Sequence, residues 1–176
     1  MSRPHKTMTA SYLSHLLCSG CGEKYSHEEL HTFCPVCQSP LLSVYDLKKA
    51  RGSVDREEIA RRKKGMWRWE EFLPVLHREN QIFLGEGDTP LLSLPHLEKQ
   101  LGLTNLFVKD ESSNPTGSFK ARGLAAAVSK AKELGVEKAI IPTAGNAGGA
   151  MAAYAARAGL RAHIFMPKDT PLANIE

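Results

Sequence analysis

Short apolar runs and longer alanine-rich stretches follow one another along the second half of the chain. The apolar runs, which favour strands, cover residues 91–94, 106–109, 139–142 and 161–166. The stretches between the last three have helical composition and spacing: one covers 118–134, and another runs from the loop at 143–149 to Arg157. Strands that alternate with helices across short loops form βαβ units. The pattern therefore predicts an α/β fold with a parallel sheet.

Two loops each follow a predicted strand and open a predicted helix. In the first, the sequence Asn-Pro-Thr-Gly at 114–117 favours a turn, and Ser118 is a candidate N-cap. The second, residues 143–149, is rich in glycine. Ligands of parallel sheets bind in the loops at the carboxyl ends of the strands. We therefore expect both loops at one edge of the sheet.

Lys120 falls in the first turn of the helix that follows the first loop. A cation is unfavourable there, because a helix N-terminus carries partial positive charge, and the same field favours the neutral amine. A neutral lysine amine can act as a nucleophile or hold a Schiff base. The alternative is a solvated surface lysine, which is the commonest state of this residue type.

The second loop, Thr143 to Gly149, lacks the spacing of the dinucleotide fingerprint and the ending of a nucleotide P-loop. Glycine removes side chains, so backbone amides at the start of the helix can approach a carboxylate or phosphate. Asn146 can both donate and accept a hydrogen bond and could bind a hydroxyl or carbonyl. The alternative is that Gly148, Gly149 and Ala152 only allow tight packing of the helix on the sheet.

All four cysteines lie within twenty residues near the N-terminus, as two C-x2-C pairs: Cys18, Cys21, Cys34 and Cys37. Two such pairs supply the four thiolates of a tetrahedral zinc site. Two disulfides or a single redox pair are the alternatives, and a reducing compartment disfavours the former. The spacing therefore predicts a structural metal site.

The chain divides by composition into four segments. Residues 14–45 carry the cysteines among short apolar pieces, which is typical of a zinc-ribbon-like module whose metal replaces a large core. Residues 1–13 are predicted to be a flexible tail, and 46–80 a helical linker. Residues 81–176 are the first part of an α/β domain. Because the pattern breaks off within a helical turn predicted for 171–176, this domain is interpreted as incomplete.

The charge and hydropathy of the chain exclude few classes of protein function. The chain has 23 Lys and Arg against 19 Asp and Glu, a net charge of +4. Its one basic run, residues 61–64, favours a solvated helix face over a nucleic-acid surface. No stretch approaches the length of a membrane-spanning helix, and the N-terminal apolar piece is too short and broken for a signal peptide. We therefore expect a cytosolic, cytoplasmic enzyme or part of one, with no nucleic acid or membrane as partner.

The two loops together resemble a known family. The sequence from Lys109 to Lys120, KDESSNPTGSFK, followed by TAGNAG from Thr143, is similar to the fold-type II pyridoxal-phosphate (PLP) enzymes. The sequence GEGDTPL from Gly85 and the cysteine module upstream resemble the threonine synthases within that superfamily. The resemblance covers about residues 17–176. It implies a three-layer αβα domain with a parallel sheet, and a homodimer when the protein is full length.

The resemblance also implies roles for individual residues. Lys120 would be the catalytic residue and would hold pyridoxal 5'-phosphate covalently, with Phe119 packed by its pyridine ring and Asn146 bonded to its ring hydroxyl. The substrate carboxylate would be bordered by the following residues: Ser118, Thr143, Ala144, Gly145, Asn146 and Ala147. The superfamily's phosphate-gripping glycine loop and the Ser or Thr at the pyridine nitrogen belong to the second half of its domain. The fragment by itself is therefore expected to be inactive.

The implied reaction is that of a lyase of amino-acid biosynthesis, which converts O-phosphohomoserine and water into threonine and phosphate. Two positions depart from the threonine synthase pattern. Ala121 stands where Asp often follows the lysine, and Thr143-Ala144 replaces the usual Ser-Ser or Ser-Thr. These departures bear on the substrate and not on the cofactor.

Two alternatives remain at this point. Within the superfamily, the chain could belong to a threonine dehydratase or a cysteine- or cysteate-forming synthase. In a different class, it could be a zinc-ribbon binding module with a non-catalytic remnant of an enzyme.

Overall fold

The computed structural model describes residues 10–172. The first half contains β1 (Leu13–Cys18), β2 (Lys24–Tyr25), β3 (Leu41–Tyr45), α1 (Leu47–Ser53), α2 (Arg56–Arg61) and the 3-10 helices η1 (Met66–Phe72) and η2 (Arg78–Asn80). The second half contains β4 (Leu91–Ser93), α3 (Pro95–Leu101), β5 (Phe107–Lys109), η3 (Glu111–Ser113), η4 (Pro115–Gly117), α4 (Lys120–Glu133), β6 (Lys138–Pro142), α5 (Asn146–Ala158) and β7 (Arg161–Phe165). Of the helical turn predicted for 171–176, residues 173–176 lie outside the described residues.

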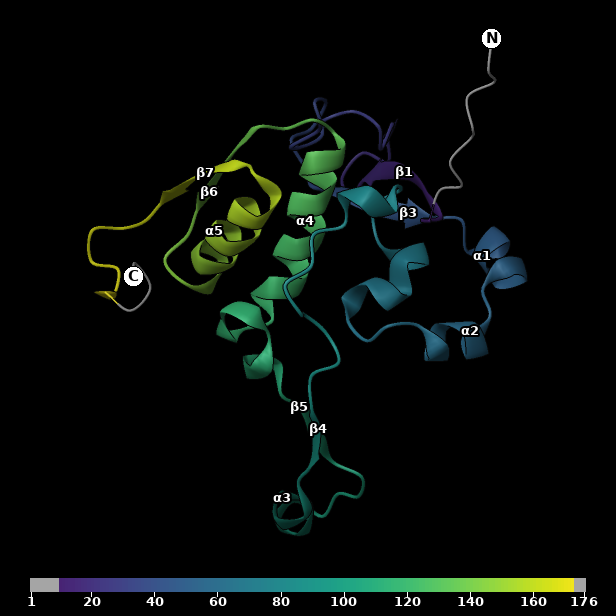
Figure 1. Ribbon diagram of the computed structural model, residues 1–176, viewed down its shortest axis with the longest axis vertical. Helices are drawn as coiled ribbons and strands as arrows, with labels where there is room; N and C mark the ends of the chain where they lie inside the picture. The colour runs from purple at the N-terminus through teal and green to yellow at the C-terminus, as the bar shows by residue number, and fades with distance from the viewer. Residues whose placement is uncertain (1–9, 173–176) are drawn as a thin grey trace.

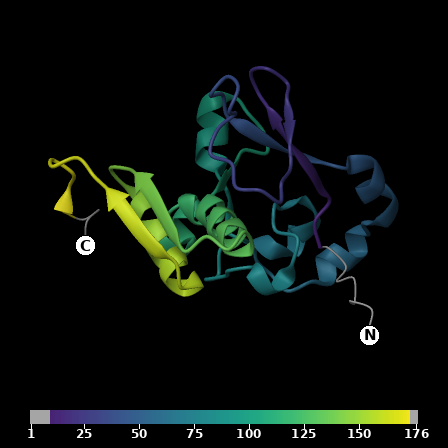
Figure 2. The same ribbon diagram turned by 90° about the horizontal axis from the view of Figure 1, so that it is seen from above.

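The N-terminal strands form an antiparallel sheet in the order β2-β1-β3. Its central strand is held on the rest of the molecule, because the Tyr12 amide donates to Glu71 O at 2.9 Å and the Ser11 hydroxyl donates to Leu73 O. Residues 1–9 of the predicted tail lie outside the described residues, and residues 11–13 are part of this packing. Figure 2 shows this sheet and the β6–β7 pair on opposite sides of the molecule.

The βαβ unit predicted at the C-terminal end is present. Strands β6 and β7 pair in parallel, and α5 makes the crossover between them. Exposed and half-buried residues alternate along both strands, β6 and β7. One face of this pair is therefore covered, and the other is open. The α/β class expected from the sequence is therefore confirmed.

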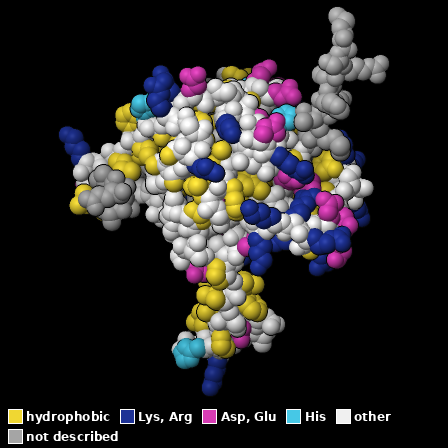
Figure 3. All heavy atoms as spheres, in the orientation of Figure 1, with side chains coloured by type: hydrophobic (Ala, Val, Ile, Leu, Met, Phe, Trp, Pro, Cys, Tyr) yellow, Lys and Arg dark blue, Asp and Glu magenta, His cyan; other side chains and the backbone are white. Residues whose placement is uncertain are grey.

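The placement of residues 106–109 in the parallel sheet was wrong for the part of the chain that the structure describes. β5 instead pairs antiparallel with β4, and together with α3 this ribbon projects from the body as an arm (Figure 1). Strands of three residues are too short for alternation to indicate their partner, and α3 reverses the chain between them. Figure 3 shows apolar side chains over this arm. Leu91 on β4 and Phe107 on β5 are exposed.

The core lies between α4 and α5, which run side by side in Figure 1. Alanines on both helices, Ala121 and Ala125 on α4 and Ala150 on α5, are fully buried. Their small side chains allow a close approach of the two helices, and Tyr154 fills the remaining space. The two helices that begin at the predicted site loops are thereby fixed relative to one another.

The membrane prediction can be compared with the helices directly. Within residues 10–172, none of the helices has the length and apolar character needed to cross a bilayer.

Candidate functional site

Lys120 is the first residue of α4, and its amine contacts an aromatic ring. Its Nζ forms no hydrogen bond or ion pair with any described residue and lies 4.7 Å from the centre of the Phe119 ring. The Phe119 side chain is 58% exposed. The Phe119 ring is therefore open to solvent, and the Lys120 amine lies against it.

The turn before Lys120 has unusual backbone geometry. Thr116 and Gly117 both have left-handed φ values, 65° and 68°. Glycine adopts this conformation freely, whereas a β-branched threonine is strained in it. Such strain persists where the surrounding structure enforces it, often at functional sites.

The sequence indicated Ser118 as the N-cap of α4, and the structure places the N-cap one residue later. The N-cap is Phe119, and it makes no capping side-chain bond. The Ser118 hydroxyl is nevertheless buried and accepts a hydrogen bond from the Lys120 amide at 3.3 Å. Ser118 therefore steadies the start of the helix from one residue before its cap.

A hydrogen-bonded cluster beside this turn was not predicted from the sequence. Arg122 binds Glu111 through two hydrogen bonds, Nε to Oε2 at 2.6 Å and Nη2 to Oε1 at 2.9 Å. Thr89 donates its hydroxyl to Glu111 Oε1 at 2.7 Å and accepts from Arg122 Nη2 at 3.2 Å. We call Thr89, Glu111, Asn114 and Arg122 the Glu111 network.

Asn114 extends the Glu111 network to the loop at residues 85–90. Its Nδ2 donates to Glu111 Oε2 at 2.8 Å, and its Oδ1 accepts from the Gly87 amide at 3.1 Å. Three segments that are distant in sequence are joined in this way. The only sequence signals were an acid just after a strand and an arginine two residues after Lys120.

The Glu111 network is electrostatically well satisfied. The Arg122 guanidinium, together with the hydrogen bonds from Thr89 and Asn114, lowers the pKa of Glu111 to about 2 against the cost of desolvation. Glu111 therefore stays ionised at any pH near neutrality. The pair is a permanent structural tie and not a proton donor.

A second buried contact links the 85–90 loop to α5. Tyr154 donates its hydroxyl to Glu86 Oε2 at 2.7 Å, and the Leu84 amide donates to the same oxygen at 3.0 Å. Burial, and then the carboxylate of Glu86, raise the pKa of Tyr154. Glu86 Oε1 is buried without a hydrogen-bond partner among the described residues.

The glycine-rich loop leads into α5, and Asn146 is the first residue of that helix. The Asn146 side chain is exposed and makes no hydrogen bond to a described residue. The loop is shaped from within, since the Gly145 amide donates to Thr143 Oγ1 at 3.3 Å. The predicted loop residues therefore lead directly into α5, and two of them, Ala144 and Asn146, are exposed. η4, which precedes Lys120, packs against α5, which follows the glycine-rich loop, although β5 is not in the parallel sheet.

The packing alternative for the glycines holds for one of them. A Cβ added at Gly148 would lie 2.8 Å from Met166 Cε and 3.0 Å from Thr143 Cγ2, whereas one at Gly149 would meet nothing within 4 Å. Close packing therefore favours glycine at 148, where the neighbouring side chains would have to shift for a larger residue, and sets no such condition at 149.

The four cysteines converge as the spacing predicted. Their Sγ atoms all lie within 4.8 Å of one another, and the sulfurs of Cys18 and Cys37 are 3.3 Å apart. Around zinc, with Zn–S bonds of about 2.3 Å, tetrahedral sulfurs lie about 3.8 Å apart. No disulfide joins any of these four cysteines in the structure. No histidine belongs to the cluster among residues 10–172.

Hydrogen bonds lower the pKa of two cysteines in this cluster, Cys34 and Cys37. Against a backbone hydrogen bond at Glu23, the Cys18 sulfur and burial raise the pKa of Cys21 to about 12. Burial opposes ionisation of Cys34, but the Tyr25 hydroxyl, 3.1 Å from Cys34 Sγ, and the amides of Val36 and Cys37 lower its pKa to about 6. The amides of Gly20 and Cys21 approach Cys18 Sγ at 3.4 Å. The donor set therefore fits a metal that binds thiolates.

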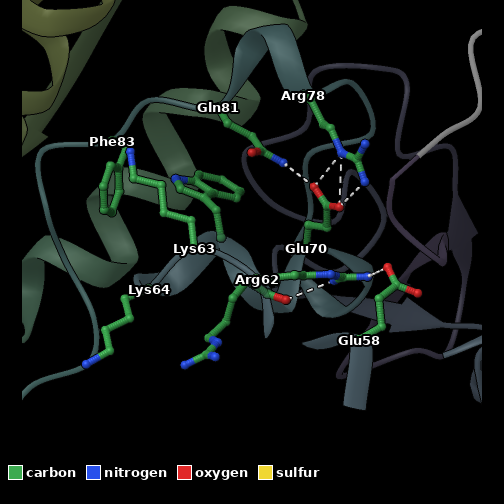
Figure 4. Close-up of a pocket in the computed structure, with 10 residues that line it drawn as sticks. Glu58, Arg62, Lys63, Lys64, Glu70, Arg78, Gln81 and Phe83 are labelled. Atoms are coloured by element: carbon green, nitrogen blue, oxygen red, sulfur yellow. Dashed lines mark hydrogen bonds and ion pairs between the residues drawn. The ribbon is translucent and has the colours of Figure 1, made fainter. Parts of the chain in front are cut away.

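A cavity of about 510 Å³ between α2, η1 and residues 78–83 contains none of the predicted site residues. Two ion pairs lie within its lining, as Figure 4 shows: Arg62 binds Glu58, and Arg78 binds Glu70. Lys63 lies along the Phe83 ring, with Nζ 5.8 Å from the ring centre. We assign these groups to packing.

Comparison with known proteins gives consistent matches. The family model described as "Pyridoxal-phosphate dependent enzyme" matches residues 82–176. A threonine synthase of Methanocaldococcus jannaschii is 40% identical over 151 residues, which are 86% of this chain and 37% of that protein. One from Methanosarcina acetivorans is 35% identical over 153 residues, 87% of this chain and 37% of that protein. One from Halalkalibacterium halodurans is 49% identical over 100 residues, 57% of this chain and 28% of that protein. The chain thus spans less than two-fifths of the length of these relatives.

Proposed function

Because the chain belongs to the pyridoxal-phosphate-dependent enzyme family, we propose that it is part of a threonine synthase. The reaction proposed for the whole protein converts O-phosphohomoserine and water into threonine and phosphate. The observation that carries the proposal is Lys120 at the start of α4, whose amine lies against the exposed Phe119 ring and makes no hydrogen bond or ion pair within residues 10–172. The identity to threonine synthases across 86% of the chain supports the choice within the family.

We assign each site residue a role that its position supports. The bound cofactor would supply an electron sink for negative charge on the substrate. Lys120 would hold the cofactor and, once released, move protons at the α and β carbons of the substrate. Phe119 would pack beside the cofactor ring, and Asn146 would hydrogen-bond to its hydroxyl. Ser118 and the loop from Thr143 to Ala147 would bind the substrate carboxylate.

The glycine loop suits an anion for a physical reason. The amides of Asn146 and Ala147 belong to the first turn of α5 and donate to no other described residue. The first amides of a helix have no intrahelical partner and lie at the positive end of its dipole. A carboxylate bound there would satisfy both the hydrogen bonds and the charge.

We further propose that the cysteine cluster holds a structural zinc ion. Convergence of the four sulfurs and the lowered pKa of Cys34 support this assignment. The homodimer, the cytoplasmic location and the absence of nucleic-acid or membrane partners stay predictions from the sequence. The substrate class that the family supports is a small amino acid.

Covalent trapping tests the proposal at its centre. The protein is incubated with pyridoxal phosphate, reduced with borohydride and digested, and the modified lysine is mapped by mass spectrometry. We expect one adduct, on Lys120, that is lost in Lys120→Ala and kept in Lys99→Ala, whose lysine lies exposed on α3. An adduct spread over several lysines, or none, would contradict the assignment.

Substrate assays separate the related activities. Phosphate release from O-phosphohomoserine is expected for a threonine synthase, whereas keto-acid formation from threonine would indicate a dehydratase. Bound zinc without any trapped cofactor would favour the binding-module alternative. All three assays apply to the protein that contains the whole family domain.

A further inference from the structure

The start of α4 has an unusual means of support. A helix N-terminus normally gains stability from a side chain at its N-cap, which binds one of the unpaired amides of the first turn. In α4 the N-cap, Phe119, has no such bond, and the Ser118 hydroxyl reaches only the Lys120 amide at 3.3 Å. This single bond of 3.3 Å is the only side-chain support that the described residues before Lys120 give the first turn, so contacts made by the turn's own side chains become important.

Arg122 makes such a contact. It lies in the same helical turn as Lys120, and its side chain leaves the helix to form three hydrogen bonds with Glu111 and Thr89. The planar guanidinium matches a carboxylate through two parallel bonds, which fix direction as well as distance. A lysine at this position would keep the charge but lose this geometry.

The groups that hold Arg122 are themselves held. Glu111 accepts from Thr89 and Asn114 as well as from Arg122, and both of these residues are buried. Asn114 also accepts from the Gly87 amide, which joins the 85–90 loop to the turn before Lys120. The carboxylate that binds Arg122 is therefore held by residues outside the helix.

We propose that Arg122, through Glu111 and Thr89, is the positioning residue for Lys120. It acts on the lysine through the backbone of the first turn and touches neither cofactor nor substrate. This inference deepens the proposed function and rests on it only for the cofactor part. The placement of the turn itself is independent of any ligand.

The first test measures the turn without cofactor. Hydrogen exchange of the amides at residues 120–123 is compared in the parent and in Arg122→Lys, with the urea midpoint recorded for each. We expect exchange of these amides to rise by at least about tenfold, which is equivalent to the loss of one charge-assisted hydrogen bond. Arg157→Lys is the matched control, because Arg157 is exposed on α5 and makes no ion pair with a described residue.

The second test measures capture of the cofactor. In the protein that contains the whole family domain, the borohydride-trapped fraction on Lys120 is followed against time at fixed pyridoxal phosphate. Arg122→Lys and Glu111→Gln are expected to slow capture, and Thr89→Val, which removes a single hydroxyl, is expected to slow it less. This graded order, at temperatures where all variants are folded, distinguishes positioning from general loss of structure.

The outcomes separate the two proposals. If the parent captures no cofactor on Lys120, the proposed function is wrong, while the exchange experiment still tests the role of Arg122. If the parent captures cofactor but Arg122→Lys changes neither exchange nor capture, the positioning role is overturned. Equal effects in Arg157→Lys would overturn it as well. Should Arg122→Lys not fold, the exchange of Thr89→Val decides, with no change at 120–123 counting against the role.

Discussion

Tyr154 and Glu86 form a hydrogen bond of 2.7 Å in which neither side chain is exposed to solvent. The bond joins the third turn of α5 to the 85–90 loop. Replacing Tyr154 with Phe leaves a buried carboxylate that keeps only the Leu84 amide on that oxygen. We expect Tyr154→Phe to lower the free energy of unfolding by about 1–3 kcal/mol, measured by urea denaturation.

Tyr12→Phe is the matched control for this loss. The Tyr12 hydroxyl makes no hydrogen bond to a described residue, and the ring is retained by the substitution. Its stability is expected to change by less than about 0.5 kcal/mol. Equal losses in the two variants would show that the Tyr154 hydroxyl contributes nothing specific.

The same pair predicts a response to alkaline pH. Burial and Glu86 raise the pKa of Tyr154 above the ordinary tyrosine value of about 10. A group with a raised pKa contributes stability below its unfolded pKa and loses it as the pH rises toward the folded value. The stability difference between the parent and Tyr154→Phe should therefore shrink above about pH 10. Tyr25 and Tyr45 also have raised pKa values, so the difference is the informative quantity and not the parent curve.

Glu111 gives the opposite response in acid. Its folded pKa is about 2, against about 4.3 in an unfolded chain. The stability that it contributes is present above about pH 4.3 and is lost as the pH falls toward about 2. Urea denaturation between pH 5 and pH 2 should therefore show a shallower decline in Glu111→Gln than in the parent. Glu28 is an exposed acid without an ion pair to a described residue, so the stability of Glu28→Gln should decline with pH as that of the parent does. The same pH dependence in Glu111→Gln and the parent would contradict the stabilising role of the Glu111 carboxylate.

The sequence predicted what depends on local pattern. Glycines with left-handed φ, Gly135 after α4 and Gly159 after α5, end their helices close to the expected positions, because only glycine adopts that conformation without strain. Each C-x2-C pair likewise placed two sulfurs together, since each pair is a local turn, whereas the meeting of the two pairs joins Cys18 to Cys37 across 19 positions. Helix ends and local turns need no knowledge of distant contacts.

Contacts between distant segments were beyond local pattern. Arg122 hydrogen-bonds to Thr89, 33 positions away, and Tyr154 to Glu86, 68 positions away. The spacing of these residues in the sequence does not predict that they form pairs. The partner of β5 was mispredicted for the same reason, because strand pairing is a tertiary choice. The sequence therefore identified the site loops but not the groups that hold them.

Gly148 and Gly149 offer a paired test of the second loop. An alanine at Gly148 would crowd Met166 and Thr143, so Gly148→Ala is expected to destabilise the fold by about 1–3 kcal/mol. Gly149→Ala fills open space in the same helix and should stabilise it by about 0.5–1 kcal/mol. Thermal and urea denaturation measure both. Destabilisation of similar size in both variants would mean that helix geometry, and not side-chain contact, sets the requirement.

The cysteine cluster can be tested by metal content. The parent is expected to bind one zinc ion per chain, and Cys34→Ser to lose it, as measured by elemental analysis of the dialysed protein. Tyr25→Phe removes the hydroxyl beside Cys34 Sγ and is expected to weaken zinc binding by about 10–100-fold in chelator competition. Full zinc content in Cys34→Ser would rule out the four-cysteine site.

β1 is held at both ends. Just before it, Ser11 and Tyr12 donate hydrogen bonds to the carbonyl groups of Leu73 and Glu71, and at its other end Cys18 belongs to the cysteine cluster. Binding of zinc at one end is then linked by mass action to the packing at the other. Above the dissociation constant, each tenfold rise in free zinc would add about 1.4 kcal/mol to the stability of the folded state. The folded fraction of the N-terminal sheet would thus respond to the zinc supply of its surroundings.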